Sequence, residues 1–323
     1  MKLGIGFGQA ALTEENLQYA KQLGVTHVII HGPRFGERGV LEFIELLRTR
    51  KFIESHGLEV AGVENLPADH WDKVLHGAPG RDEQIKKVCE TIENMGRAGI
   101  PILGYYFSIA GVWGHWRAYD SGGGRGDAGL KSFDYDLVKD APVVETGRVS
   151  VEEMWDRLAY FLERVVPVAE DAGVKLAAHQ DDPPAEELRG AGRLLTSHEG
   201  MKRLVETVPS PNSGLEFCQG TVAEMGPDRA IDAIRYFGGQ GKIFYVHFRN
   251  VRGQFPKFDE VFIDEGDVDM FEAMRAYKEV GFDGVIIPDH APRVAGDSDH
   301  RRQGVTFALG YMKALMQMVE KLP

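Results

Sequence analysis

Four residues that can bind a metal ion each stand at the end of a separate strand-like run of apolar residues. They are His179 in VKLAAHQ, Cys218 in SGLEFCQG, His247 in KIFYVHFRN and Asp289 in DGVIIPDH. Two imidazoles, a thiolate and a carboxylate brought together would make a divalent-metal site with nitrogen, sulfur and oxygen ligands. Each residue alone is ordinary, since a strand-end His or a buried Cys usually has a structural role. The prediction therefore depends on the position that the four residues share in consecutive repeats.

Such a site requires a fold in which the ends of the strands converge. Strand-like runs alternate with helix-like segments along the 323 residues, and these runs lie at 3–8, 27–32, 59–67, 101–107, 175–180, 214–220, 242–250 and 284–290. Alternation of this kind indicates a parallel sheet covered by helices. The number of repeats favours a closed (β/α)8 TIM barrel over an open doubly wound sheet, and the carboxyl ends of the barrel strands meet at one face.

The chain is predicted to form a single TIM-barrel domain over 1–323, although its length would also fit two smaller domains. Residues 108–148 interrupt the alternation with SGGGRGDAG and several aromatic residues, and we expect a long, flap-like loop there, after the fourth strand. The first turn, GIGFGQA, is not a dinucleotide-binding loop, because it lacks the third glycine and no acidic residue ends the second strand.

Helix boundaries are marked by residues that satisfy free backbone groups. Thr13 is placed to begin the first helix, and Ser150 with Glu153 has the spacing of a capping box. Gly57 and Gly99 stand where two helices should end. The last helix is predicted over about 302–320.

The composition excludes several classes of protein. A formal net charge of −12 argues against nucleic-acid binding, which needs a basic face. No apolar stretch approaches the roughly 18 residues that span a membrane, and MKLGIGFGQA does not resemble a signal peptide. The two cysteines, Cys89 and Cys218, do not form a disulfide framework, and low cysteine usage favours a cytoplasmic location.

Seven segments carry a family resemblance in the order of the chain. They are VENLP (63–67), AGIPILGYYF (98–107), AAHQDDPP (177–184), EFCQGT (216–221), VHFRNVRG (246–253), GDVDM (266–270) and PDHAP (288–292). Together they resemble the mannonate dehydratase family. That resemblance implies a xylose-isomerase-like TIM barrel, which dehydrates D-mannonate to 2-keto-3-deoxy-D-gluconate with Mn²⁺ or a similar divalent ion. It also implies that the metal ligands are His179, Cys218, His247 and Asp289.

The sequence departs from the family pattern in two places. Gln180 stands where the family usually has a proline after the first ligand histidine. In RRQGVTFALGY, Val305 or Thr306 falls where the family has a tyrosine implicated in proton transfer, and Tyr311 lies one turn later. Thr306, Tyr311 or a residue of the 108–148 segment remains open as its replacement.

Dehydration of a sugar acid requires removal of the proton α to the carboxylate and loss of the β-hydroxyl. His290 is expected to act as a catalytic acid or base beside Asp289, or alternatively to hold Asp289 in place. Arg249 is expected to act in catalysis at the rim of the barrel, where it would clamp the substrate carboxylate. The alternative for Arg249 is a salt bridge to Asp267 or Asp269.

Several polar or aromatic residues near strand ends are candidates for substrate binding. We expect contributions from Asn250, Asp182, Tyr105, Trp113, His31 and Glu64. The alternatives are that Asp182 caps the turn before Pro183 and that Trp113 packs the 108–148 segment onto the barrel. Strand alternation places either Tyr105 or Tyr106 inside the barrel. The run His300–Arg302 predicts either an anionic ligand near the mouth or a solvated surface.

The ligand types leave the metal and the reaction partly open. Histidine and cysteine favour Fe²⁺, Zn²⁺ or Co²⁺, whereas the family resemblance favours Mn²⁺; we expect Mn²⁺ or Fe²⁺. The expected partner is a small anionic sugar acid in hexuronate catabolism, and the family implies a homo-oligomer. The alternatives are a dehydratase of another sugar acid, a sugar or sugar-acid isomerase or epimerase, and a metal-binding barrel without turnover.

Overall fold

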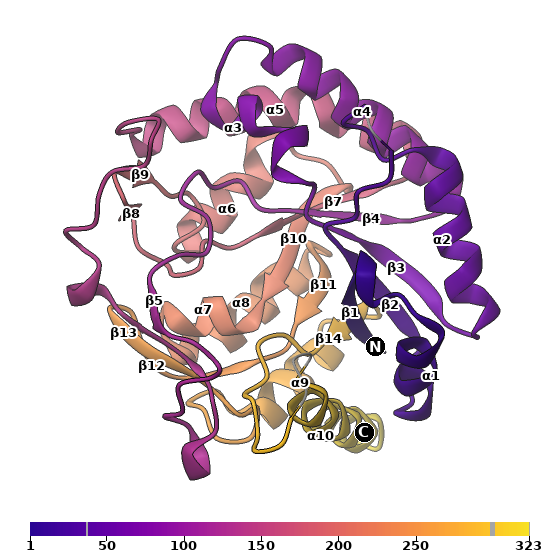
Figure 1. The fold of residues 1–323 in the computed structure, drawn as a ribbon, viewed down its shortest axis with the longest axis vertical. Coiled ribbons are helices and arrows are strands. Elements are labelled where there is room, and N and C mark those ends of the chain that lie inside the picture. Colours follow the sequence, from indigo (N-terminus) through magenta and orange to yellow (C-terminus); the bar gives the residue numbers. More distant parts are fainter. Residues whose placement is uncertain (37, 298–300, 323) are drawn as a thin grey trace.

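The computed structural model describes residues 1–36, 38–297 and 301–322, and within them eight parallel strands close into a barrel (Figure 1). Each strand pairs with its neighbour in the chain, and Lys2 opposite Val285 closes the barrel. The barrel strands are β1 (Lys2–Gly8), β2 (His27–His31), β3 (Glu59–Glu64), β4 (Ile102–Tyr105), β7 (Lys175–His179), β10 (Ser213–Cys218), β11 (Ile243–His247) and β14 (Val285–Ile287). The predicted TIM barrel is confirmed.

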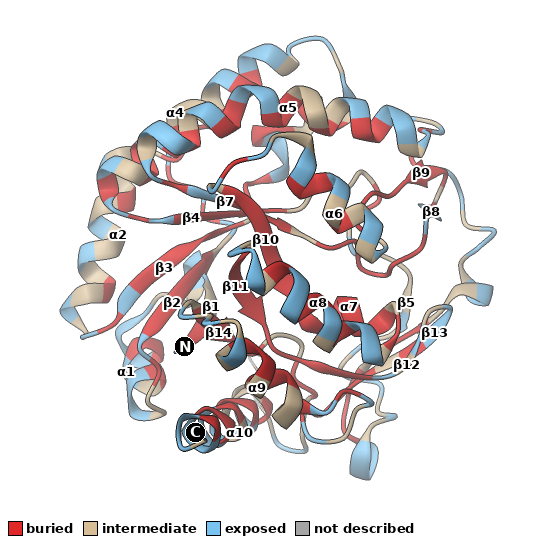
Figure 2. Cartoon of the chain, turned by 180° about the vertical axis from the view of Figure 1, so that it is seen from behind, coloured by how far each residue is buried: buried red, intermediate tan, exposed pale blue. Residues whose placement is uncertain are grey.

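Helices surround the barrel, and their apolar faces are turned toward it (Figure 2). They are α1 (Glu14–Gln22), α2 (Phe43–Ser55), α3 (Asp72–His76), α4 (Arg81–Ala98), α5 (Val151–Ala172), α6 (His198–Thr207), α7 (Gln219–Glu224), α8 (Pro227–Gly239), α9 (Met270–Glu279) and α10 (Arg302–Glu320). Among the described residues, no helix combines the length and apolarity needed to cross a bilayer. The bounds of α10 agree with the predicted last helix.

The predicted helix boundaries are formed by the expected interactions. The Thr13 side chain accepts a hydrogen bond from the backbone N–H of Asn16, and Ser150 and Glu153 form a reciprocal capping box. Gly99 ends α4 in the left-handed conformation, and Gly57 follows the end of α2 with φ of +72°. These caps fix where each helix begins and ends relative to the strand that follows it.

Two hydrophobic layers support the barrel. The larger core lies between strands and helices. A smaller cluster of barrel-strand residues fills the interior, namely Ile29, Ala61, Ile102, Ala177, Phe244, Tyr245, Val285 and Ile287. Because both faces of the strands are buried, the strands appear in the sequence as continuous apolar runs.

The 108–148 segment is not only a loop, contrary to the expectation. It contributes β5 (His115–Arg117) and β6 (Lys131–Asp134), which join a hairpin of β12 (Asn250–Gln254) and β13 (Lys257–Val261). The result is a four-stranded antiparallel sheet in the order β12-β13-β6-β5. The pairing joins segments more than a hundred residues apart, so local sequence patterns did not reveal it. The remaining elements are a short pair of strands and four 3₁₀ turns. The strands are β8 (Glu187–Leu188) and β9 (Ala191–Gly192), and the turns lie at Gln9–Ala11, Ala68–His70, Arg125–Asp127 and Tyr135–Leu137.

Candidate metal centre

The four predicted metal ligands meet at the carboxyl-terminal face of the barrel. His179, Cys218 and His247 end the adjacent strands β7, β10 and β11, and their ligand atoms lie within 4.8 Å of one another. Asp289 follows β14, with Oδ2 3.9 Å from Cys218 Sγ and 3.6 Å from His247 Nδ1. The parallel register, which pairs Cys218 with His247, produces this convergence from residues spread over 111 positions of the chain.

Each imidazole uses its second nitrogen to hold the ring in place. His179 Nδ1 lies 2.5 Å from the backbone oxygen of Gln180, which leaves Nε2 for a ligand. His247 Nε2 lies 3.0 Å from Glu64 and 3.1 Å from Glu216. The buried Nδ1 of His247 has no hydrogen-bond partner within the described part of the chain. Metal-binding histidines have this arrangement, with one nitrogen fixed by an oxygen and the other directed at the ion.

The electrostatics favour a thiolate at Cys218. Burial raises the pKa of the thiol, but the positive charge of Arg249 and the neighbouring imidazoles of His179 and His247 lower that pKa well below its usual range. The Thr221 hydroxyl adds a contact of 3.1 Å to Sγ. Because the thiolate is the form that binds metals, this donor set fits a divalent ion.

Glu64 was expected to bind substrate, but its carboxylate lies beneath the cluster and contacts two histidines. Its carboxylate contacts His31 Nδ1 at 2.9 Å as well as His247. Burial raises the pKa of Glu64, yet the charges of these two histidines hold it well below its usual range. Burial, together with the charge of Glu64, raises the pKa of Glu216 to about 8. Gly104 is required here, since a Cβ atom would lie 2.7 Å from Glu216.

Arg249 is not at the rim, and its predicted contacts are wrong. The side chain is only 3% exposed and donates to Asp289 (2.9 Å), Glu224 (2.9 Å) and Asp182 (2.8 Å). The guanidinium therefore bridges three carboxylates and holds the ligand Asp289, instead of pairing with Asp267 or Asp269. Its position two residues beyond a barrel strand indicated the correct face, but nothing in the local pattern indicated burial.

His290 lies beside the cluster and remains accessible. Its Nε2 is 3.6 Å from Asp289 Oδ1, and its Nδ1 is 2.6 Å from Glu260 Oε2. Lys131 Nζ approaches the ring to 3.3 Å, and 22% of the side chain is exposed. The geometry accommodates both predicted roles, contact with a substrate and support of Asp289.

Two of the residues expected to bind substrate have structural roles instead. The amide of Asn250 donates to the carbonyls of Ile263 and Val268 and accepts from the Val268 N–H, so it joins β12 to the chain before α9. Trp113 packs on a small apolar cluster and lies under the guanidinium of Arg189 at 4.9 Å. The alternative for Trp113, packing of the 108–148 segment, is the one observed.

Tyr105 faces the helices, and its neighbour Tyr106 faces the site. The Tyr105 ring packs against Trp71 and Phe161 at 6.3 and 6.0 Å, and its hydroxyl has no partner among the residues described. The Tyr106 ring is 5.6 Å from the ring of His179, and its hydroxyl accepts a 2.6 Å hydrogen bond from Arg193. The choice of Tyr105 as a substrate-binding residue is therefore wrong, because alternation gave two options and no way to select one.

Matched phenylalanine substitutions test this correction. Tyr105→Phe removes a buried hydroxyl that has no partner among the described residues. We therefore expect unchanged catalysis and a free energy of unfolding equal to that of wild type or higher by up to about 1 kcal/mol. Tyr106→Phe leaves a donor of Arg193 unpaired and should cost about 1–3 kcal/mol. Urea denaturation measures the free energy of unfolding of both variants. A larger loss of stability in Tyr105→Phe than in Tyr106→Phe would contradict the roles given to the two hydroxyls.

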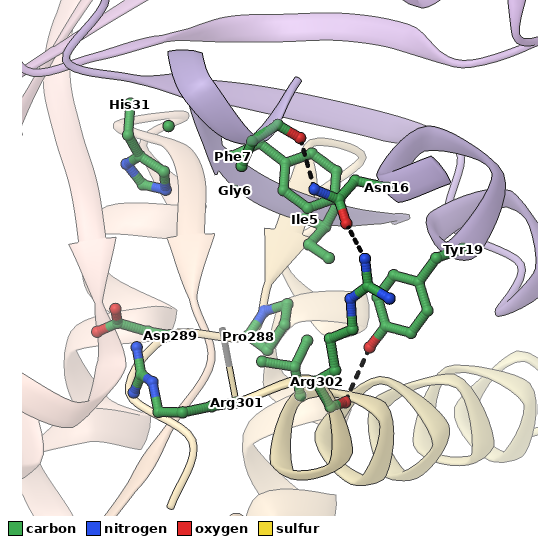
Figure 3. A pocket seen from close by; sticks show the side chains of 13 residues that line it. Ile5, Gly6, Phe7, Asn16, Tyr19, His31, Pro288, Asp289, Arg301 and Arg302 are labelled. Carbon is green, nitrogen blue, oxygen red and sulfur yellow. Dashed lines mark hydrogen bonds between the residues drawn. The ribbon is translucent and has the colours of Figure 1, made fainter. Parts of the chain in front are cut away.

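A pocket of about 300 Å³ adjoins the cluster, between the ends of β1, β2 and β14 and the start of α10 (Figure 3). Figure 3 shows His31, Asp289 and Arg301 among the side chains that line it. Arg301 packs on the Tyr119 ring at 3.9 Å, while Arg302 is bonded to Glu15. Of the predicted basic run, His300 lies outside the described residues.

Three residues were left open as replacements for the family tyrosine, and the structure separates them. Thr306 is hydrogen-bonded to the Tyr19 hydroxyl at 2.8 Å, and Tyr311 packs against the main core. Tyr119, from the 108–148 segment, instead brings a phenol near the site: its ring lies 6.4 Å from that of His290. Its buried hydroxyl has no hydrogen-bond partner in the described part of the structure. The sequence left a residue of the 108–148 segment open as the replacement, but it did not single out Tyr119, because the contact depends on a sheet that local patterns did not reveal.

The fold places the chain in the class of xylose-isomerase-like TIM barrels. It superposes on a mannonate dehydratase from Streptococcus suis serotype 2 with a TM-score of 0.88 at 24% identity, covering 99% of this chain and 95% of that one. A xylose isomerase domain protein from Planctomyces limnophilus gives a TM-score of 0.66 at 14% identity, with 99% of each chain covered.

Within that class, the chain belongs to the D-mannonate dehydratase (UxuA) family. The family's sequence model matches residues 1–145 and 143–322. A mannonate dehydratase of Thermotoga petrophila is 31% identical over 320 residues, which cover 86% of this chain and 87% of that protein. The family predicted from the seven motifs is confirmed.

Proposed function

We propose that the protein is a metal-dependent hydro-lyase that converts D-mannonate to 2-keto-3-deoxy-D-gluconate and water. The observation that carries the proposal is the convergence of His179, Cys218, His247 and Asp289 beside a polar pocket, in a member of this family. Two imidazoles whose other nitrogens are fixed, a thiolate and a carboxylate suit a resident divalent ion.

These four residues would hold the ion, which would supply Lewis-acid stabilisation of the charge that develops when the proton α to the carboxylate leaves. The proton from C2 must pass to a base, and the hydroxyl at C3 must accept a proton as it leaves as water. His290 Nε2, on the side of Asp289, is placed to exchange one of these protons. Burial raises the pKa of Tyr119 well above its usual range, so its phenol stays protonated and can donate a hydrogen bond. The resulting enol then becomes the 2-keto product.

We assign recognition of the substrate carboxylate to Arg301, in place of Arg249. Both Arg301 and Arg302 line the pocket. The guanidinium of Arg302 is bonded to the side chains of Glu15 and Asn16, whereas Arg301 donates through Nη1 to the backbone carbonyl of Ala291 and forms no salt bridge with a carboxylate among the described residues. Arg301→Gln should raise KM for D-mannonate about 10- to 100-fold, the effect of losing a charge-assisted hydrogen bond. Arg302→Gln, the matched control, should change KM less. Equal KM values for wild type and Arg301→Gln in steady-state assays would exclude this assignment.

The experiment on the function itself uses D-mannonate deuterated at C2. Protein loaded separately with Mn²⁺, Fe²⁺, Co²⁺ or Zn²⁺ is incubated with the substrate, and both 2-keto-3-deoxy acid and deuterium release are followed. Keto-acid formation with Mn²⁺ or Fe²⁺ as the best ions supports the proposal. Deuterium release without loss of water would indicate an epimerase instead, and product only from another sugar acid would change the substrate.

We further propose a place in hexuronate catabolism, a cytoplasmic location and a homo-oligomeric state. Family membership supports the place in hexuronate catabolism and the homo-oligomeric state, and the low cysteine content supports the cytoplasmic location. Light scattering coupled to size-exclusion chromatography tests the assembly: a monomeric mass would contradict it.

A further inference from the structure

We propose that Glu260 is a positioning residue that orients His290 for catalysis, and that His115 holds Glu260 in place. Neither Glu260 nor His115 belongs to the barrel, since they lie on β13 and β5 of the antiparallel sheet. The inference rests on the proposed dehydratase function, in which His290 exchanges a proton with the substrate. It adds a role for the sheet that the barrel alone does not explain.

The two oxygens of Glu260 face two different imidazoles. Oε2 lies 2.6 Å from His290 Nδ1, and Oε1 lies 3.2 Å from His115 Nε2. The Glu260 side chain is 0% exposed, and only 9% of the His115 side chain is exposed. A carboxylate buried so completely persists only with charged or hydrogen-bonding partners, and these two rings provide them.

The register of the sheet explains how Glu260 reaches the site. Glu260 on β13 pairs with Lys131 on β6, and Lys131 Nζ approaches His290 to 3.3 Å. Asp259, the preceding residue, points to the other side and accepts a hydrogen bond from Ser132 at 2.5 Å. Burial raises the pKa of Glu260, but His290, Lys131 and Arg249 hold it well below its usual range, so the carboxylate is charged.

The contact between Glu260 and His290 determines which nitrogen of the His290 ring is available to the substrate. A carboxylate oxygen 2.6 Å from Nδ1 favours the form of the ring that carries a proton on Nδ1. Nε2, 3.6 Å from Asp289 Oδ1, is then the nitrogen left for the substrate. Loss of the acceptor would let the ring rotate and change tautomer. Partners of this kind typically contribute 10- to 100-fold to activity, and we expect a loss of about that size.

A second cation among His115, Asp182 and Glu260 is the competing explanation, because their ligand atoms lie within 4.8 Å of one another. Two contacts favour positioning. Asp182 is already bonded to Arg249 through Oδ2 at 2.8 Å, and Glu260 lies closer to His290, at 2.6 Å, than to His115, at 3.2 Å. The other Asp182 oxygen, Oδ1, is 3.7 Å from His115 Nε2, and both atoms lack a hydrogen-bond partner among the described residues, which is what a cation would require. The metal content of the variants separates the two explanations.

The test compares Glu260→Met, which removes both acceptor oxygens at similar volume, with Glu260→Gln, which keeps one. In the Mn²⁺-loaded protein with D-mannonate, we expect kcat to fall about 10- to 100-fold in Glu260→Met and less in Glu260→Gln, with KM within about twofold of wild type. Asp259→Asn, on the opposite side of β13, is the control and should keep wild-type kcat. A Glu260→Met kcat within twofold of wild type, or loss of one of two bound metal ions, would overturn the proposal.

A second readout does not depend on turnover. The nuclear magnetic resonance spectrum of Zn²⁺-loaded protein labelled with ¹⁵N-histidine reports which ring nitrogen carries a proton. The His290 signal is assigned as the one that is absent in His290→Gln. In wild type, we expect a proton on Nδ1 of His290. That proton signal should be lost or shifted in Glu260→Met and retained in Asp259→Asn. An unprotonated Nδ1 in wild type would overturn the positioning role even if the enzyme is active. If the spectrum is as expected but the protein does not convert D-mannonate, the proposed function is rejected and the contact between Glu260 and His290 is still supported.

Discussion

Cys218→Ser is expected to lower turnover of D-mannonate by at least about three orders of magnitude and to release most of the bound metal. Serine keeps the size but not the thiolate, and a hydroxyl is rarely ionised in such a site. Metal Lewis-acid catalysis supplies several kcal/mol, and each 1.4 kcal/mol corresponds to about a tenfold change in rate. Product assays and elemental analysis of the purified variant check both effects together.

Cys89→Ser is the matched control for this substitution. Cys89 lies on α4 and is half-buried against the main core, away from the barrel face. Its thiol makes a weak contact of 3.8 Å to the carbonyl of Arg164. We expect wild-type metal content and kcat. If both cysteine variants retain metal equally, Cys218 is not a ligand.

Arg249→Met should destabilise the fold by about 3–5 kcal/mol, the usual result of removing one partner from a buried ionic network. The guanidinium bonds Asp289, Glu224 and Asp182, and Met would leave all three carboxylates without this partner. Arg249→Lys should also destabilise the fold, because a single ammonium group lacks the planar fork of donors that reaches three acceptors. Guanidinium denaturation measures the loss, and Asp289 should bind metal more weakly in both variants.

Arg252→Met, three residues further along the chain on β12, provides the comparison. Arg252 is 51% exposed and pairs with Glu265 at 3.5 Å, a geometry that contributes little in water. We expect a change within about 0.5 kcal/mol. A similar loss of stability for both arginine variants would mean that the network around Arg249 is not the source of the effect.

The parts of the molecule that depend on local periodicity could be predicted from sequence. The barrel strands and the caps at Thr13, Gly99 and Ser150 follow from apolar runs and from residues with specific hydrogen-bonding roles. The convergence of His179, Cys218, His247 and Asp289 followed from topology, since every barrel strand presents its carboxyl end to the same face.

The parts that depend on distant pairing could not be predicted. Glu260, His115 and Tyr119 reach the site through an antiparallel sheet whose strands come from two segments far apart in the chain. Without that sheet, residues 108–148 read as a loop. Arg249 and Asn250 illustrate a second limit, because position beyond a strand indicates the face but not whether a side chain is buried. Their roles depend on which carboxylates and carbonyls surround them.

The most direct test of the metal-dependent function is removal and replacement of the ion in wild-type protein. The rate of 2-keto-3-deoxy acid formation from D-mannonate is measured before chelation, after chelation and after stepwise addition of Mn²⁺. We expect chelation to abolish the rate and about one equivalent of Mn²⁺ per chain to restore it. An undiminished rate in the chelated, metal-free protein would contradict a metal-dependent reaction.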